Sequence, residues 1–369
     1  MSVQLNTKNG KFKTLKISVF LTVCFIFGIS SPGFALNIVL NDMLGTMTTT
    51  QAAAFDTAAG IWESLFSDDV TVRIDVGFES LGSGIIGSTY SAKEDAAYTD
   101  IYNALVADSS STDDTTAVSN LQTDSLTTII NDPADINTEY LVDGQHVVNN
   151  NLYVTRANLK ALGLLADDGS SDAEIKFSTN FAFDFDNTDG INNDEMDFIG
   201  VAAHEIGHAL GFVSGVDIMD IISSPDGHYK DIYDISAVAN SNLFSVLDLY
   251  RYSEQSVSAD ALDWGVGGDS YFSIDGGTTN NALLSTGSYN GDGRQASHWK
   301  DNLGMGLMDP TTGYGELSVI SDLDIQGFDV IGWDTAASPA VPEPGTVVLM
   351  CTGILGLLLC NRRRKRVLN

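Results

Sequence analysis

Alternating apolar and polar residues mark the strands that we expect in this chain. In residues 70–79, "VTVRIDVGFE", Val, Ile and Phe alternate with polar or small residues, which is the pattern of a half-buried strand. A stricter alternation runs through residues 174–186, "EIKFSTNFAFDFD". One face of that segment carries Ile175, Phe177, Thr179, Phe181, Phe183 and Phe185. The pattern predicts a single strand along the whole of residues 174–186.

Apolar residues three or four positions apart predict the helices. Residues 52–66 place four apolar side chains on one helical face, namely Phe55, Ala59, Trp62 and Phe66. We expect a second helix over residues 92–108 and a buried helix over residues 198–212, whose residues are mostly apolar or small. Residues 241–255 could form a further helix. The Ser, Thr and Asp-rich residues 109–124 are expected to be a solvated loop.

The N-terminal residues have the layout of a secretory signal peptide. Four lysines from Lys8 to Lys16 precede the apolar run "ISVFLTVCFIFGIS", and "GFA" follows before Leu36. The apolar run is too short to be a good transmembrane helix. We therefore expect residues 1–35 to be removed by cleavage after Ala35. The alternative is a retained N-terminal anchor.

The C-terminal residues combine three features of a sorting signal. Residues 338–345 form a linker with a Pro-Glu-Pro triplet (Pro342, Glu343, Pro344), residues 346–361 are apolar, and residues 362–369 are basic. An apolar run followed by cations is a stop-transfer layout with the basic end in the cytoplasm. Together they resemble the PEP-CTERM signal of Gram-negative bacteria. The resemblance implies recognition by an exosortase and transient anchoring before release or attachment outside the cell. A plain single-pass anchor is the alternative.

Charge and cysteine content restrict the partners of the middle of the chain. Between Leu36 and Val341, nine basic and 48 acidic residues give a formal charge of −39. Such a surface repels nucleic acid and anionic lipid, so we expect no nucleic-acid partner and membrane contact only through the C-terminal segment. All three cysteines lie in the terminal apolar segments, at Cys24, Cys351 and Cys360. Residues 36–337 are therefore expected to fold without a disulfide.

The stretch "HEIGHALGFVS", His204 to Ser214, carries the candidate chemistry. On a helix, His204 and His208 are one turn apart, so both imidazoles can bind a single metal ion. Glu205 points to the side, where a carboxylate can take a proton from a zinc-bound water. A catalytic zinc needs three protein ligands. In the long form of this signature a third histidine stands at the position of Ser214, so the third ligand must lie elsewhere.

Several residues compete for the place of the third ligand. His146 and His228 lie in polar stretches that are typical of solvated loops, whereas His298 is followed by a tryptophan and, ten residues later, by Met308. A thermolysin-like site would instead use a glutamate from a later helix, and Glu254 in residues 241–255 is the candidate. Other acidic residues downstream of the motif are Asp217, Asp220 and Asp248.

The motif helix and the segment around His298 resemble the leishmanolysin-like branch of the metzincin zinc proteases. In that group an insertion separates an HExxHxxGF helix from a histidine that is often followed by tryptophan. The resemblance implies that His204, His208 and His298 bind zinc, with Glu205 as general base and Met308 in a turn beneath the metal. The chain also resembles bacterial PEP-CTERM proteins with a HEIGH-type helix.

This resemblance covers residues 181–212 and 295–333, and the chain departs from leishmanolysin in lacking cysteines between the terminal segments. It implies an α+β fold: a metzincin-like zincin with a twisted mixed sheet, an active-site helix, and a C-terminal subdomain that carries the third ligand and the Met-turn. Residues 36–337 would then be the catalytic domain.

The resulting expectation is an exported zinc metalloendopeptidase that acts on protein or peptide substrates. We expect the strand at residues 177–185 to border the cleft and to pair with the extended substrate. Tyr314 could assist the oxyanion, although an ordinary loop tyrosine is the alternative. Calcium is a second candidate cofactor, at the turn with Asp184, Asp186 and Asp189, although the spacing does not fit an EF-hand.

Two rival functions fit the same sequence. An extracellular matrix or adhesion protein with a structural or vestigial zinc site would suit the acidic, Ser and Thr-rich composition and the sorting signal. A metal-dependent hydrolase acting on something other than peptides is the other, because a fold does not determine its substrate.

Overall fold

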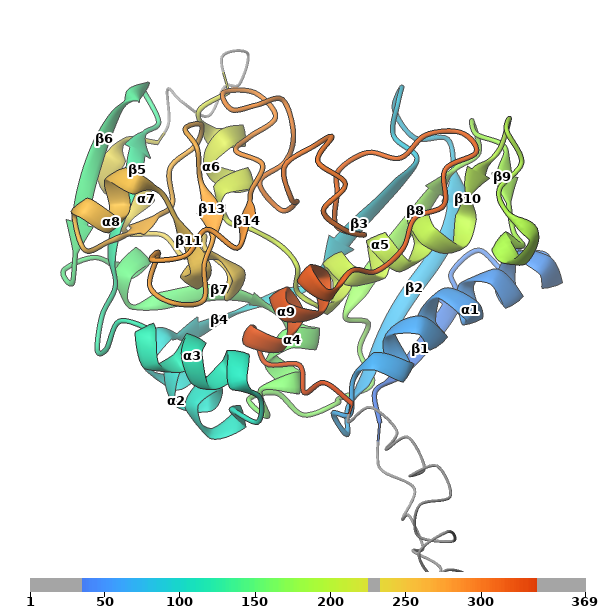
Figure 1. Cartoon of the computed structure of the whole chain (residues 1–369), viewed down its shortest axis with the longest axis horizontal. Coiled ribbons are helices and arrows are strands. Elements are labelled where there is room, and N and C mark those ends of the chain that lie inside the picture. The colour runs from blue at the N-terminus through green and yellow to red at the C-terminus, as the bar shows by residue number, and fades with distance from the viewer. Residues whose placement is uncertain (1–34, 225–232, 337–369) are drawn as a thin grey trace, which may run out of the picture. The chain divides into compact units, whose positions relative to one another are not determined.

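The computed structural model describes residues 35–224 and 233–336, and its four-stranded sheet lies on the right in Figure 1. The strand order is β1-β2-β8-β3, in which β1 (Asn37–Asp42), β2 (Thr71–Glu79) and β8 (Ala173–Ser178) are parallel. The edge strand β3 (Gly87–Ser91) runs antiparallel to β8. The strand predicted over residues 70–79 is confirmed, and the sheet is mixed.

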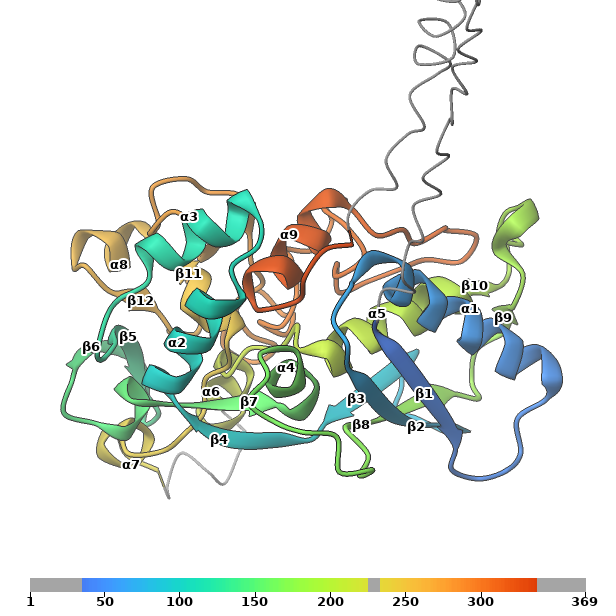
Figure 2. The same ribbon diagram turned by 90° about the horizontal axis from the view of Figure 1, so that it is seen from below.

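Two helices cover one face of this sheet (Figure 2). The helix predicted over residues 52–66 is α1 (Thr49–Leu65), and the one predicted over residues 198–212 is α5 (Phe198–Leu210). The Asp197 side chain accepts a hydrogen bond from the Gly200 amide and caps α5, and Gly211, with a φ of 129°, ends it. Both helix predictions are confirmed.

The prediction of one long strand over residues 174–186 is wrong. β8 ends at Ser178, and after a turn the chain forms only the two-residue strand β9 (Phe183–Asp184), paired with β10 (Met196–Asp197). The aromatic residues serve a different purpose from the expected one. Phe177, Phe183 and Phe185 surround the buried ring of Phe198, with centroid distances of 4.7, 5.4 and 4.6 Å. The alternation therefore reflects an aromatic cluster at the start of α5.

Two predictions between β3 and β8 also need correction. Residues 92–108 are not one helix, because Lys93–Ala97 forms β4, which pairs with β7 (Asn151–Thr155), and only Tyr98–Asp108 is helical, as α2. The expected loop at residues 109–124 contains the helix α3 (Thr112–Asn120). A capping box starts α3, in which the Ser111 hydroxyl accepts from the Asp114 amide and the Asp114 carboxylate accepts from the Ser111 amide. Good capping and one buried apolar side chain, Ala117, stabilise a helix too polar for the periodicity to reveal.

The remaining described elements lie between β4 and β8, around β9, and after α5. Residues 241–255 are not a helix, since they contain the 3-10 turn η4 (Leu247–Tyr250), the strand β11 (Arg251–Tyr252) and the start of α8 (Glu254–Ser258). The other described elements, in chain order, are β5 (Thr127–Asp132), β6 (Asp135–Asp143), η1 (Val147–Asn149), α4 (Arg156–Ala161), η2 (Asn187–Asp189), α6 (Val216–Ile222), α7 (Ile235–Ala239), β12 (Leu262–Asp263), β13 (Tyr271–Phe272), β14 (Ala282–Leu283) and α9 (Asp322–Val330).

Buried tryptophans connect α5 to the elements around it. The indole nitrogen of Trp62 donates to the Ala203 carbonyl oxygen at 2.9 Å, and that of Trp333 donates to the Leu210 carbonyl oxygen at 3.0 Å. Both rings are fully buried. A large side chain that is buried with its one donor satisfied stabilises packing without a polar penalty. The first contact joins α5 to α1, and the second joins α5 to the segment that follows α9.

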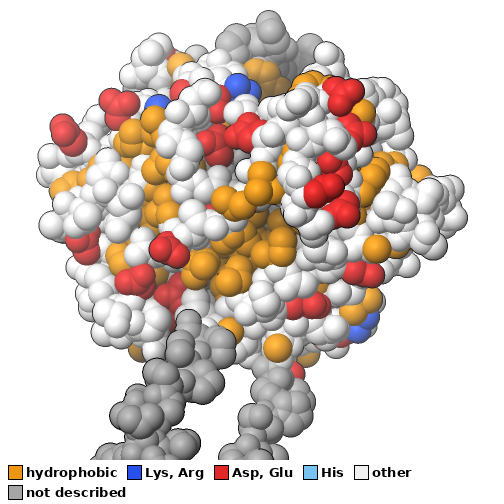
Figure 3. Space-filling view, turned by 45° about the vertical axis from the view of Figure 1, so that its right-hand side comes forward, with side chains coloured by type: hydrophobic (Ala, Val, Ile, Leu, Met, Phe, Trp, Pro, Cys, Tyr) orange, Lys and Arg blue, Asp and Glu red, His pale blue; other side chains and the backbone are white. Residues whose placement is uncertain are grey.

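Acidic side chains are scattered over the face of the molecule shown in Figure 3, and other acidic side chains are buried. Asp68 is 8 % exposed, and its carboxylate accepts a hydrogen bond from the Asp334 amide at 3.0 Å. Burial, assisted by the negative charge of Asp334, raises the pKa of Asp68 to about 7. Ionisation of Asp68 is therefore less favourable in the folded chain than in the unfolded chain.

We expect the variant Asp68→Asn to be more stable than the wild type at pH 8 and equally stable near pH 4. Because the folded pKa is raised, the wild type loses stability as the pH rises from about 4 to about 7. The full shift corresponds to about 4 kcal/mol, and neighbouring carboxylates that titrate together with Asp68 reduce the expected gain to about 2 kcal/mol. Urea unfolding of both proteins at the two pH values measures it. An equal free energy of unfolding at pH 8 would show that Asp68 ionises without penalty.

Candidate metal centre

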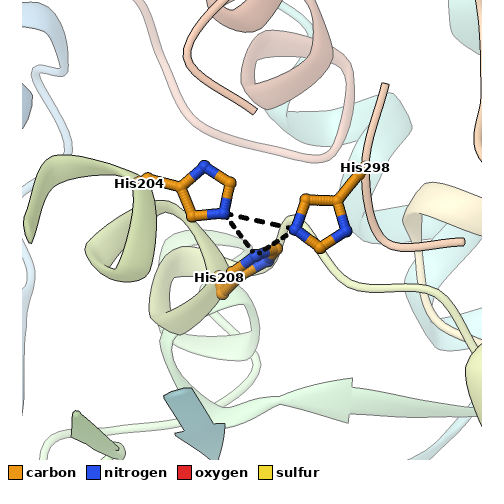
Figure 4. Close-up of side chains that lie close together, drawn as sticks. All are labelled: His204, His208 and His298. Atoms are coloured by element: carbon orange, nitrogen blue, oxygen red, sulfur yellow. Dashed lines mark hydrogen bonds between the residues drawn. The ribbon is translucent and has the colours of Figure 1, made fainter. Parts of the chain in front are cut away.

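Three histidines from two distant segments meet in one place (Figure 4). His204 and His208 project from α5, and His298 comes from the loop after β14. The Nε2 atom of His204 lies 3.1 Å from that of His208 and 3.2 Å from that of His298, and the remaining separation is 3.1 Å. Among the described residues this is the only group of three or more histidine, cysteine or acidic side chains spaced to hold one metal ion.

Backbone carbonyls fix the orientation of each ring. The Nδ1 atom of His204 lies 2.7 Å from the Leu307 carbonyl oxygen, and that of His208 lies 2.7 Å from the Phe212 carbonyl oxygen. His298 approaches the Gln295 carbonyl oxygen at 3.2 Å. Since a carbonyl only accepts, each Nδ1 carries the proton and each Nε2 is left with a lone pair. This second contact is the one that metal-binding histidines characteristically make.

The geometry fits a tetrahedral zinc ion. Three lone pairs about 3 Å apart repel one another unless a cation lies among them, and zinc bound at about 2.0–2.1 Å places its nitrogen ligands about 3.3 Å apart. Burial lowers the pKa of His208 to about 3 and that of His298 well below its usual range. Both rings are therefore neutral at physiological pH, as metal ligands must be.

Met308 lies against α5 at the level of the histidines. It is fully buried, and a methyl group added at Gly207 would lie only 2.7 Å from its sulfur. Glycine at position 207 therefore permits the close approach of the methionine between the two helical ligands. Met308 therefore packs against α5 at Gly207, the residue before His208, and its place in a turn beneath a metal stays a prediction.

Asp324 is a site residue that sequence analysis missed. It is fully buried at the start of α9, where it accepts hydrogen bonds from the Leu307 amide at 2.7 Å, the Met308 amide at 3.1 Å and the Trp299 indole at 2.8 Å. One carboxylate thus holds both the segment whose carbonyl orients His204 and the residue next to His298. The capping sequence "SDLD" predicts the helix start, but it does not reveal these distant contacts.

The acidic alternatives to His298 lie elsewhere or have other partners. Asp217 accepts from the amides of Ala296 and Ser297, at 2.6 and 3.2 Å, and so positions the His298 loop. Asp248 accepts from the Gly215 amide, and Asp220 accepts from amides in residues 289–290. Glu254 is exposed on α8. None of these four joins the histidine group, and neither does the half-buried His146, while His228 lies outside the described residues.

Glu205 lies between α5 and the edge strand β3. Its side chain is 6 % exposed, and the Thr89 hydroxyl donates to its Oε2 atom at 2.6 Å. A methyl group at Gly87 would lie 2.5 Å from Oε1, so only glycine leaves room for this carboxylate. Burial raises the pKa of Glu205, which favours its holding a proton. Thr89 and Gly87 were not identified from the sequence, because the turn-like sequence "GSGIIGST" gives no sign of a strand beside the helix.

A cleft of about 870 Å³ runs along β3 and past the three histidines and Glu205. The expectation that residues 177–185 border it is wrong, because none of them lines the cleft and because β8 is paired on both sides, with β2 and β3. The bordering strand is β3. Ile86 accepts from the Ser178 amide and Ala92 donates to the Asp172 carbonyl oxygen. With this register the backbone groups of Gly87, Thr89 and Ser91 face away from β8.

Two further candidates lie outside this cleft. Tyr314 is 55 % exposed and does not line it. In the acidic turn, the Asp184 carboxylate accepts from the Asp186 and Asn192 amides at 3.0 and 3.1 Å, and Asp186 accepts from the Thr188 amide at 3.1 Å. These carboxylates stabilise the turn itself, and with Asp189 they form no group spaced to hold one ion.

Comparison with known proteins identifies one segment. The PEP-CTERM protein-sorting motif matches residues 340–364, which include the Pro-Glu-Pro triplet, the whole apolar segment at residues 346–361 and the first three residues of the basic cluster. The motif implies export, recognition by exosortase sorting machinery, and membrane anchoring or surface sorting through the C-terminus. These residues lie outside the described ones, and within residues 35–224 and 233–336 no helix is long and apolar enough to cross a membrane. Searches of curated proteins and of solved structures gave no match.

Proposed function

We propose that the chain is an exported zinc metalloendopeptidase of the metzincin type, with His204, His208 and His298 as zinc ligands. One observation carries the proposal: three inward-facing Nε2 atoms line a cleft together with the buried carboxylate of Glu205. Three protein ligands leave one coordination position for water or substrate, as in catalytic zinc sites, whereas structural sites are closed by four. No fourth ligand joins the group among the described residues.

The residues of the chain divide the work as follows. Bound zinc supplies a water of lowered pKa and polarises the carbonyl to be cleaved. Glu205 takes the proton at Oε1, since Oε2 is engaged by the Thr89 hydroxyl, and passes it to the departing amine. Asp324 positions both histidine segments. It binds the Met308 amide, next to the Leu307 carbonyl that orients His204, and it binds the indole of Trp299, next to His298.

An extended substrate would pair with the free edge of β3. The backbone groups of Gly87, Thr89 and Ser91 face the cleft beside the histidines, and strand addition to an exposed sheet edge is a recurring way to bind peptides. We infer antiparallel pairing, which is slightly more stable per residue than parallel pairing. The rest of the proposal concerns location: the mature protein acts at the surface of a Gram-negative cell or outside it, after transient anchoring by residues 346–361.

Metal content and peptidase activity of purified residues 36–341 test this function. We expect one zinc per chain and cleavage of denatured casein. Dialysis against 1,10-phenanthroline should abolish cleavage, and adding one equivalent of zinc should restore it. A serine-protease inhibitor serves as the control for contaminating peptidases and should have no effect.

Two outcomes would contradict the proposal. One tightly bound zinc without cleavage of any protein substrate would favour the matrix or adhesion protein with a structural zinc site. A failure to bind zinc would leave the three lone pairs unexplained and would remove the basis of the mechanism.

A further inference from the structure

Lys93 is a cation in the cleft that forms no ion pair within the part of the chain that the structure describes. It begins β4, two residues beyond the last residue of β3, and β4 continues from the end of that strand (Figure 2). The side chain is partly buried and lines the same cleft as His208. Its ammonium group makes no hydrogen bond or ion pair with any residue of the described ranges, and it lies 5.7 Å from the ring centre of Tyr153.

The nearest carboxylates do not neutralise this charge by direct contact. Asp217 and Asp248 are close enough to favour the charged form of Lys93. However, Asp248 is occupied by the Gly215 and Ser245 amides, both at 2.8 Å, and Asp217 is occupied by the loop of His298. Both carboxylates therefore serve the backbone, and within residues 35–224 and 233–336 nothing accepts a hydrogen bond from the three donors of the ammonium.

A poorly hydrated ammonium group favours an anionic ligand. Burial lowers the pKa of Lys93, which means that its charged form is less well solvated than in water. A carboxylate from a bound molecule would supply the missing hydrogen bonds and the opposite charge. The other cation in the described lining of the cleft, Arg294, is already paired with Asp301 at 2.9 Å. Of the two cations in the described lining, Lys93 is thus the one to which a carboxylate of a bound molecule would bind more strongly.

We propose that Lys93 binds a side-chain carboxylate of the peptide substrate and makes the cleft selective for Asp or Glu close to the scissile bond. The proposal rests on the proposed peptidase function and names its substrate class. Gly87 lies beside Glu205, and the Ser91 hydroxyl donates to the His208 carbonyl oxygen. Lys93 is two residues further along, about 7 Å at the rise of an extended strand. An antiparallel substrate therefore presents its acidic residue two or three positions on the N-terminal side of the cleaved bond.

We expect a preference for Asp or Glu only at the substrate position that faces Lys93, and no general preference for acidic peptides. The formal charge of −39 between residues 36 and 341 repels polyanionic chains. Asp309 and Glu316 also line the cleft and disfavour further acidic side chains near them. A single carboxylate in an otherwise neutral or basic peptide is the best match.

Paired peptides test the proposal. One neutral parent sequence is made with Asp or Asn at each position from three residues before to three residues after the cleaved bond, and kcat/KM is measured for every pair. We expect the Asp peptide to be cleaved about tenfold faster than its Asn partner at one or two positions on the N-terminal side. Lys93→Gln should abolish that ratio, and Lys93→Glu should reverse the preference toward a Lys-containing peptide.

Matched controls separate selectivity from folding and from the peptidase function itself. Lys176→Gln alters a lysine that is paired with Glu79 and Glu174 outside the cleft, and it should leave the Asp to Asn ratio unchanged. Zinc content verifies that each variant is folded. Equal cleavage of Asp and Asn peptides by the wild type, or a ratio that survives Lys93→Gln, would overturn the role of Lys93 alone. If no peptide is cleaved, the peptidase proposal fails, and dissociation constants of the same peptide pairs still decide whether Lys93 binds a carboxylate.

Discussion

Replacing His298 by alanine is expected to remove bound zinc and peptidase activity together. Two ligands on α5 would remain, and the third corner of the Nε2 triangle would be empty. Loss of a residue that merely orients a ligand costs 10- to 100-fold in metal affinity, so loss of a ligand itself should cost more than about 100-fold. Zinc per chain after equilibration in a buffer of fixed free zinc, together with casein cleavage, measures both effects.

His146→Ala is the matched control for this variant. His146 is half-buried at the start of η1 and takes no part in the histidine group, so its removal should leave zinc content and cleavage as in the wild type. Retention of both zinc and activity in His298→Ala would move the third ligand to another residue. It would also remove the main support for the metzincin resemblance, while a zinc protease of another type would remain.

The sequence predicts those parts of the site whose residues lie close together along the chain. The spacing of His204 and His208 is set by one helical turn, and the structure places them on α5 as predicted. His298 is 90 residues beyond His208, and no local pattern relates the two, so only the family resemblance singled it out. Asp324 and Thr89 could not be found in this way, because their roles arise from contacts between segments that are more than 15 and 115 residues apart.

The errors in the fold have a common physical origin. Hydrophobic periodicity reports which side chains are buried, but it does not report what buries them. Phe183 and Phe185 are apolar because they pack on Phe198 of α5, and not because a strand continues beyond Ser178. Conversely, α3 has almost no apolar face, and its capping box at Ser111 is the stronger signal. Edge strands such as β3 are short and rich in small residues, so their sequences resemble turns.

The site is held together by buried carboxylates rather than by disulfides. Asp324 fixes the segment around Leu307 and Met308, Asp217 fixes the loop of His298, and Asp248 fixes the turn after α5. Each accepts hydrogen bonds from two or more backbone amides, so one side chain holds several points of the backbone in place. The three loops that surround the histidines are thus anchored independently of the metal. In the proposed peptidase, this arrangement would keep the shape of the site while one coordination position exchanges water and substrate.

Replacing Glu205 by glutamine is expected to abolish cleavage while zinc stays bound. The amide has nearly the shape of the carboxylate, and Thr89 can still donate to its oxygen, so the loop and strand contacts remain. A glutamine cannot accept the proton of the attacking water. General base catalysis contributes about 10²- to 10⁴-fold, so kcat should fall by about 10³-fold. Zinc content should equal that of the wild type, because Glu205 is not one of the three nitrogen ligands.

Thr89→Val separates proton transfer from the positioning of the carboxylate. The variant keeps the carboxylate of Glu205 and removes only the hydroxyl that holds Oε2 at 2.6 Å, so we expect a fall in kcat of about tenfold, within the range of one charged hydrogen bond.

A Glu205→Gln protein that binds zinc and cleaves casein at the wild-type rate would show that another group accepts the proton. Besides Glu205, the carboxylates that line the described cleft are Asp217, Asp309 and Glu316, and Asp217 is already occupied by the His298 loop. Full activity would thus direct the search to Asp309 and Glu316.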